Sequence, residues 1–248
     1  MRAKYLLFVP LFLLSLIATV HAQTKNNYTA QWRKIDSLIV KQGLTKSALA
    51  EVKKIYAAAK KEQNDVQVIK SLVYTMNLQE ESEEEATPAN IQMLEKEVAS
   101  ASQPAKSILQ SLLAQTYLDY FRSRYWRLYN RTSTVDFKKE DIATWNAADF
   151  HKRITELYLA SISAETLLQQ TKLEPFDALI IKGNVRHLRP TLFDLLAHEA
   201  LDYFKSDERE IAKPVNPFEI SQAVAFAEPE RFSSFTFTTT DSSSLHFK

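Results

Sequence analysis

The chain has 248 residues, of which 45% are hydrophobic and 25% charged, and its formal net charge at pH 7 is +1. This is an ordinary globular composition with enough apolar residues for a core. A nearly neutral chain lacks the basic surface that nucleic acid requires. The sequence has no cysteine, which excludes disulfides, thiolate zinc sites, a cysteine nucleophile and a lipid-modified N-terminal cysteine. Its two glycines are too few for a hairpin-rich β domain or for a glycine-rich phosphate-binding loop.

Residues 1–22 have the pattern of a secretory signal peptide. Arg2 and Lys4 precede an apolar run from Tyr5 to Val20, which is shorter than the roughly 20 residues that cross a membrane comfortably. Small residues near Ala22 predict cleavage after it, and the alternative is a membrane anchor. No later segment is apolar enough to span a bilayer, so the mature chain is expected to be secreted, periplasmic or part of the cell envelope.

Residues 23–205 are predicted to form an α-helical domain, because apolar residues recur at helical spacing between turn-forming residues. The first four helices form two pairs, 28–63 and 65–102, which repeat at a period of about 36 residues. This period is typical of αα-hairpins stacked in the manner of tetratricopeptide arrays, although the consensus of that repeat is absent. The helices are expected at 28–42, from 45, from 65, from 87, at 104–130, at 146–171 and at 190–205.

Several residues are predicted to begin or end these helices. Thr29, Thr45 and Asp65 are expected N-caps, because their side-chain oxygens accept hydrogen bonds from first-turn amides. The dipeptide Thr87-Pro88 is expected to start the fourth helix, with proline at its first position. Gly43 is expected to end the first helix, because glycine adopts the left-handed conformation of a helix C-terminus without strain.

The stretch Leu173–Phe204 joins the helical region to an unlike tail. It is predicted to be a packed corner, in which Gly183-Asn184 tolerates positive φ, followed by a helix. Beyond it, Phe232–Phe237 and Leu245–Phe247 alternate apolar and polar residues as strands do. Residues 206–248 are therefore predicted to be a linker and an incomplete β-prone segment, and the fold class to be mainly all-α.

Aromatic and basic residues gather at the end of the 104–130 helix. Tyr125, Trp126 and Tyr129 are interleaved with arginines that include Arg124. Such a pattern is typical of surfaces that stack on a ligand or bind a partner. The alternative is that the rings fill the core while arginine stems cover their edges. We predict a protein-binding surface at these four residues.

His198-Glu199 begins like the metalloprotease motif H-E-x-x-H, but Asp202 replaces the second histidine. A catalytic zinc needs three protein ligands, and even with His187 as a distant partner the set is incomplete. Asp194 lies one turn before His198 and is expected to hydrogen-bond it. We predict no catalytic, cofactor or metal site and no enzymatic activity. A metal-dependent hydrolase centred on His187, His198 and Glu199 is the alternative.

Four long segments, 28–62, 103–121, 141–162 and 169–204, resemble the N-terminal region of the very large alpha-2-macroglobulin-like proteins of Bacteroidetes-type bacteria. The resemblance implies a secreted or envelope protein built from many β-sandwich macroglobulin domains, in which cleavage of a bait segment leads to protease trapping. It also implies that the chain is a fragment, the helical start of such a protein, with the first β domain beginning at Phe232. Some members carry a thioester made from Cys and Gln in a C-x-E-Q motif. This chain has no cysteine, so no functional residue is carried over.

We therefore expect the N-terminal helical region of a macroglobulin-like endopeptidase inhibitor, serving as a structural or interaction module. The alternative is a free-standing helical-repeat module that binds proteins of the periplasm or cell envelope. In both cases the expected partners are proteins, either proteases or envelope proteins, and not nucleic acid.

Overall fold

The computed structural model describes residues 27–129, 141–206 and 223–236, and these ranges are mainly helical with no strand among them. The predicted all-α class is confirmed for this part of the chain. The signal peptide predicted at 1–22 and the strand predicted at 245–247 lie outside it. No helix within these ranges is long and apolar enough to cross a bilayer. The α-helices are α2 (Tyr28–Val40), α3 (Thr45–Lys61), α4 (Asp65–Glu80), α5 (Ala86–Ser100), α6 (Ala105–Ser123), α7 (Tyr125–Tyr129), α8 (Ala147–Ile162), α9 (Glu165–Gln170), α10 (Leu192–Lys205) and α11 (Pro229–Ser234).

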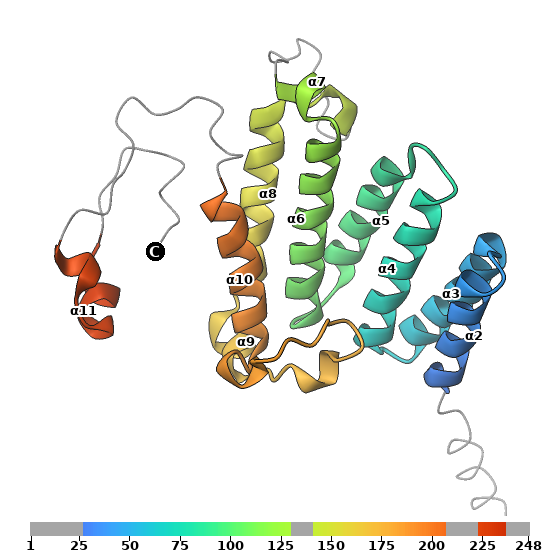
Figure 1. Cartoon of the computed structure of the whole chain (residues 1–248), viewed down its shortest axis with the longest axis horizontal. Coiled ribbons are helices and arrows are strands. Elements are labelled where there is room, and N and C mark those ends of the chain that lie inside the picture. Colours follow the sequence, from blue (N-terminus) through green and yellow to red (C-terminus); the bar gives the residue numbers. More distant parts are fainter. Residues whose placement is uncertain (1–26, 130–140, 207–222, 237–248) are drawn as a thin grey trace, which may run out of the picture.

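The helices pack in chain order. Each of α2 to α6 contacts the next, α6 contacts α8, and α8 contacts α10. Figure 1 shows α2, α4, α6 and α10 side by side in one layer, with α3, α5 and α8 behind them. Contacts of α6 with both α4 and α10 link the front layer. Each layer therefore has an outer face. On each face, side chains from helices that alternate along the chain lie next to one another.

Three clusters of buried side chains hold these layers together. The main cluster extends from α3 to α10 and is fully closed around Phe121, Phe150 and Ile154. A smaller cluster at the N-terminal end packs α2 against α3 around Ile35. The third lies beneath the segment between α9 and α10, and its members are Leu168, Leu173, Phe176, Leu192 and Leu196.

The N-caps of α2 and α4 differ from those predicted. Asn27, not Thr29, caps α2, and Asn64, not Asp65, caps α4; each asparagine side chain accepts from the amide three residues later. Asn has the same short acceptor as Asp, and the displaced Asp65 now lies in the first turn, where the helix dipole favours a carboxylate. Thr45 is the first residue of α3, which has no side-chain cap.

The helix boundaries at α5 and α2 show how backbone chemistry decides them. Helix α5 begins at Ala86, so Thr87-Pro88 lies inside its first turn and does not cap it. First-turn amides have no acceptor within the helix, so the missing N–H of proline costs nothing there. The prediction for Gly43 is confirmed: its φ is 63°, and its N–H donates to the carbonyl of Ile39 at 3.2 Å.

Two long predicted helices are each broken in two. The helix predicted at 104–130 is interrupted at Arg124, and the one predicted at 146–171 at Ser163. After each break the chain turns so that an apolar side chain, Leu128 or Leu168, reaches a core cluster. Burial of these side chains outweighs the weak local preference for a continuous helix.

The corner and the tail also differ from the prediction. Neither Gly183 nor Asn184 has a positive φ. Residues 232–234, expected to begin a strand, belong to helix α11 (Pro229–Ser234) instead. Pro229 occupies one of the first two positions of that helix, where its fixed φ favours helix formation. Phe237, the last residue of the predicted strand, lies outside the described residues.

Candidate functional site

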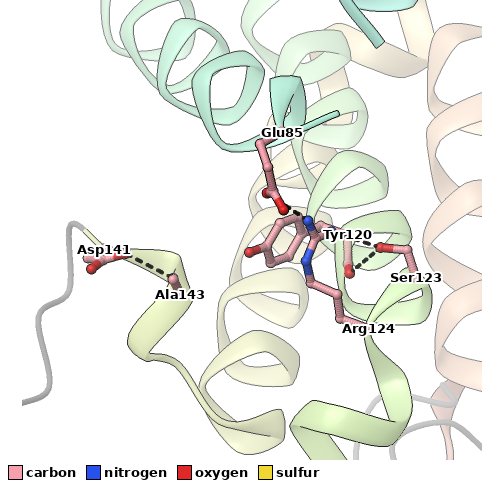
Figure 2. A network of polar contacts seen from close by, with 6 residues as sticks. All are labelled: Glu85, Tyr120, Ser123, Arg124, Asp141 and Ala143. Atoms are coloured by element: carbon pink, nitrogen blue, oxygen red, sulfur yellow. Dashed lines mark hydrogen bonds and ion pairs between the residues drawn. The ribbon is translucent and has the colours of Figure 1, made fainter. Parts of the chain in front are cut away.

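Arg124, at the junction of α6 and α7, is the centre of a polar network (Figure 2). Its guanidinium donates to the Glu85 carboxylate at 2.8 Å and to the Ser123 hydroxyl at 3.1 Å. The guanidinium also lies over the Tyr120 ring, 4.1 Å from its centroid. The Arg124 side chain is only 17% exposed. It ties the end of α6 to the start of α5 and so has a structural role.

The other predicted surface residues divide between core and solvent. Tyr125 is half-buried and meets Phe121 edge to face, with 5.7 Å between ring centroids. Trp126 packs edge to face on Tyr125 but is 84% exposed. The side chain of Tyr129 lies outside the described residues. Of the two aromatic side chains that the structure describes at the predicted surface, Trp126 is exposed and Tyr125 is half-buried.

The alternative of a metal-dependent hydrolase centred on His187, His198 and Glu199 finds no support in the geometry of the described residues. The described residues contain no group of three His, Asp or Glu side chains able to hold a metal ion. His198 Nδ1 lies 2.8 Å from the backbone carbonyl of Asp194, whose carboxylate is held by Thr191. The expected hydrogen bond between Asp194 and His198 is present, but it is made to the backbone carbonyl, because the Asp194 carboxylate completes a capping box. His187 is exposed on the preceding loop. Burial of Glu199, followed by the neighbouring Asp202 charge, raises the pKa of Glu199.

An apolar groove between α4 and α6 was not predicted. It has a volume of about 340 Å³. Three separate segments line it: α4, α6 and the loop between α9 and α10. We call it the α4–α6 groove, and its apolar lining residues are Ile69, Val73, Ile108, Leu112, Ala178 and Leu179.

Lys70 and Tyr74 add polar groups to this groove. The Lys70 amine lies 4.5 Å from the Trp32 ring centroid and 5.6 Å from that of Tyr74. The Tyr74 hydroxyl donates to Asp36 at 3.0 Å, and burial followed by this bond raises its pKa to about 12. Burial lowers the pKa of Lys70, and the Asp36 charge opposes that shift. The indole N–H of Trp32 donates to the side chain of Gln67 at 2.6 Å, which fixes the ring beneath the amine.

The loop that closes one side of the groove is held at its neck. Leu173 N–H donates to the Pro190 carbonyl at 3.2 Å, and Leu192 N–H donates to the Thr171 carbonyl at 2.8 Å. Leu173 itself is buried in the third core cluster. Because both ends of the loop are fixed to one another, the loop presents its side chains to α4 and α6 in a defined position.

An ion pair inside the same loop stabilises its far side. The Asp177 carboxylate pairs with Lys182 at 2.6 Å and with Arg186. These two cations hold the pKa of Asp177 below its usual value, the Lys182 bond contributing most. The next two residues, Ala178 and Leu179, line the groove. The pair therefore fixes the turn that carries the groove's outer wall.

A second hollow, of about 490 Å³, lies on the opposite layer between α5 and α8. At its floor Tyr117 stacks on Trp145, with ring centroids 5.4 Å apart. Arg153 donates to both carboxylate oxygens of Glu95 at 2.7 and 2.9 Å, and Tyr117 donates to the same carboxylate. At its rim Asp141 accepts from the backbone of Ala143 (Figure 2). The charges of Glu95 and Arg153 at this floor thus satisfy one another, and Lys96 and Asp141 are the other charged residues of the lining.

Comparisons of the chain with family models, curated proteins and solved structures found no match. The function proposed for this protein therefore rests on the surface geometry of the described residues. Of these two hollows, the α4–α6 groove is the more apolar in its named residues, and Lys70 is the charged residue named in its lining.

Proposed function

We propose that the helical domain is a protein-binding module and that an extended segment of a partner docks in the α4–α6 groove. The observation that carries the proposal is an open apolar groove of about 340 Å³ built from three segments of the chain. This volume lies within the roughly 300–1,000 Å³ typical of ligand sites. Each apolar side chain that a partner buries there contributes about 1.5–3 kcal/mol before the cost of ordering.

The groove is better suited to a peptide segment than the α7 surface is. Binding energy concentrates where apolar anchors enter pockets from which water is excluded. Trp126 is 84% exposed, and Arg124 is already engaged by Glu85. By contrast Val73 and Leu112, on neighbouring helices, line the groove from α4 and α6, and a partner's side chain would enter the space between them.

Peptide selection tests the site. Peptides of random sequence, about 12 residues long, would be selected on the intact protein and their affinities measured by fluorescence anisotropy. Ala178→Tyr fills the groove from an exposed loop position, and Val73→Asp places a charge in its wall. We expect each change to weaken binding at least about tenfold, because an unpaired charge or a filled pocket removes apolar burial. Thermal melts check that both variants fold.

The matched control is the other candidate surface. Tyr125→Ala combined with Trp126→Ala, in a variant that still folds, should leave these affinities unchanged. If the double change abolishes binding while Ala178→Tyr has no effect, the docking site lies at α7 and the groove proposal is wrong.

We further propose, from the sequence resemblance to macroglobulin-like proteins, that the module works within a protease-trapping envelope protein. There it would serve as a structural or interaction part and not as the trap itself, since the chain has no cysteine for a thioester. An immunoblot of source cells with serum against residues 24–205 tests this. A band several times larger than 28.5 kDa supports it. A band of that size contradicts it and favours a free-standing module of the periplasm or envelope.

A further inference from the structure

We infer that the segment bound in the α4–α6 groove carries a carboxylate that pairs with Lys70, so that the partner is an acidic as well as apolar extended peptide. This inference rests on the proposed function and specifies its ligand. The charge of the groove supports it, because Lys70 is the one charged residue among the described residues that line the groove.

The surroundings of Lys70 explain why its charge is available. No ion pair or hydrogen bond of its amine occurs within the described ranges, and its contacts are the faces of the Trp32 and Tyr74 rings. Rings stabilise a cation by their electron-rich faces but do not neutralise it. Asp36, the acid whose charge acts on this amine, accepts the Tyr74 hydroxyl at 3.0 Å.

Two partly buried arginines have the carboxylate partner that Lys70 lacks among the described residues. Arg124 pairs with Glu85, and Arg153 with Glu95, at 2.8 and 2.7 Å. A partly desolvated ammonium is costly unless it is paired, and a charge-assisted hydrogen bond from an ammonium to a carboxylate is about twice as strong as a neutral one. A ligand carboxylate would supply at Lys70 the partner that the protein itself supplies to these arginines.

The position of Lys70 also sets the geometry of the ligand. Lys70 and Val73 lie one turn apart on α4, and Leu112 faces them from α6. A peptide that reaches from the Lys70 amine across the groove would place its acidic group over α4 and its apolar side chains towards α6. Lys70 is therefore expected to determine specificity, while the apolar walls supply most of the affinity.

The experiment uses the selected peptides and their analogues in which acidic residues are replaced by amides. Lys70→Met keeps the apolar stem and removes the charge. We expect the acidic peptides to bind this variant about tenfold more weakly, and their amide analogues to bind wild type and variant equally. Raising the salt concentration should weaken only the acidic peptides on the wild type. Lys53→Met, which removes an exposed lysine of α3, is the control for net charge.

The outcomes separate the two proposals. If Ala178→Tyr blocks peptides that are not enriched in acidic residues, or that bind Lys70→Met unchanged, the groove is the site but the carboxylate inference is wrong. If Ala178→Tyr fails to block the peptides, both the inference and the proposed function fail. Loss of all peptides, amide analogues included, in a folded Lys70→Met would also overturn the inference, because the stem and not the charge would then be responsible.

Discussion

At the scale of single residues, two helix ends show what a left-handed backbone position costs. Gly43 after α2 has φ 63°, and Gln63 after α3 has φ 54°. At Gln63 the helix is closed by two hydrogen bonds, from Gln63 N–H to the Lys60 carbonyl and from Asn64 N–H to the Ala59 carbonyl. This pattern is the one in which glycine is preferred, so glutamine holds the position under strain.

We predict that Gln63→Gly stabilises the protein by about 0.5–1 kcal/mol. A left-handed position costs a non-glycine residue about 1–2 kcal/mol, and glycine removes this cost. Glycine also gives the unfolded chain more freedom, which offsets about 0.4–1 kcal/mol of the gain in stability. The matched change Gly43→Ala should destabilise by a similar amount, although its Cβ would meet no atom within 4 Å. Urea unfolding measures both. A destabilising Gln63→Gly would show that the glutamine side chain contributes contacts worth more than the strain.

The same pair shows what the sequence allows to be predicted at this scale. Gly43 was predicted to end its helix because its residue type has a conformational meaning. Gln63 carries no such signal, since its conformation is imposed by the turn that leads into α4. Arg124 is similar: its identity suggested a surface, whereas the ion pair with Glu85, 39 residues away in the sequence, decides its role.

At the scale of elements, periodic apolar residues predicted where helices lie but not where they break. The starts near Asn146 and Thr191 are confirmed, because both residues cap their helices in a capping box. The breaks at Arg124 and Ser163 had no local signal, since neither residue disrupts a helix. They arise because Leu128 and Leu168 must reach core clusters that sequence spacing alone does not reveal.

Helix α10 offers the sharpest test of a predicted boundary. Thr191 Oγ accepts from the Asp194 N–H at 3.3 Å, and the Asp194 carboxylate accepts from the Thr191 N–H at 2.9 Å. We predict that Thr191→Ala destabilises the protein by about 1 kcal/mol, because it leaves a first-turn amide without an acceptor. Thermal or urea unfolding measures the loss. Thr191→Ser keeps the hydroxyl and should unfold like wild type; an equal loss in both would assign the effect to the threonine methyl group.

At the scale of the whole molecule, the candidate site depends on the order in which the helices pack against one another. Lys70, Leu112 and Leu179 come from segments far apart in sequence, and they meet because α4 and α6 are neighbours in the front layer and the loop folds over them. Sequence periodicity identifies the faces of single helices and cannot say which faces are neighbours. The groove was therefore beyond prediction, although every residue that lines it was visible as apolar or basic.

The packing of the helices in chain order also predicts how stability is distributed along the molecule. Helix α2 packs in the small N-terminal cluster, while α6 and α8 share the main one. In structures where elements contact chiefly their neighbours, ends open without unfolding the whole. Ile35 and Ile154 are both 0% exposed, one in each cluster, so the same substitution to alanine tests both regions.

We predict that Ile35→Ala and Ile154→Ala, each costing about 2–5 kcal/mol locally, differ in reach. In Ile35→Ala, amide hydrogen exchange should accelerate in α2 and the adjoining part of α3, and protection in α6 and α8 should stay as in wild type. In Ile154→Ala, exchange should accelerate throughout the helices. Because Trp32 of α2 supports the Lys70 amine, Ile35→Ala should also weaken acidic peptides more than their amide analogues. Uniform acceleration in Ile35→Ala would mean that α2 is part of one cooperative unit, and the groove would then depend on the whole fold.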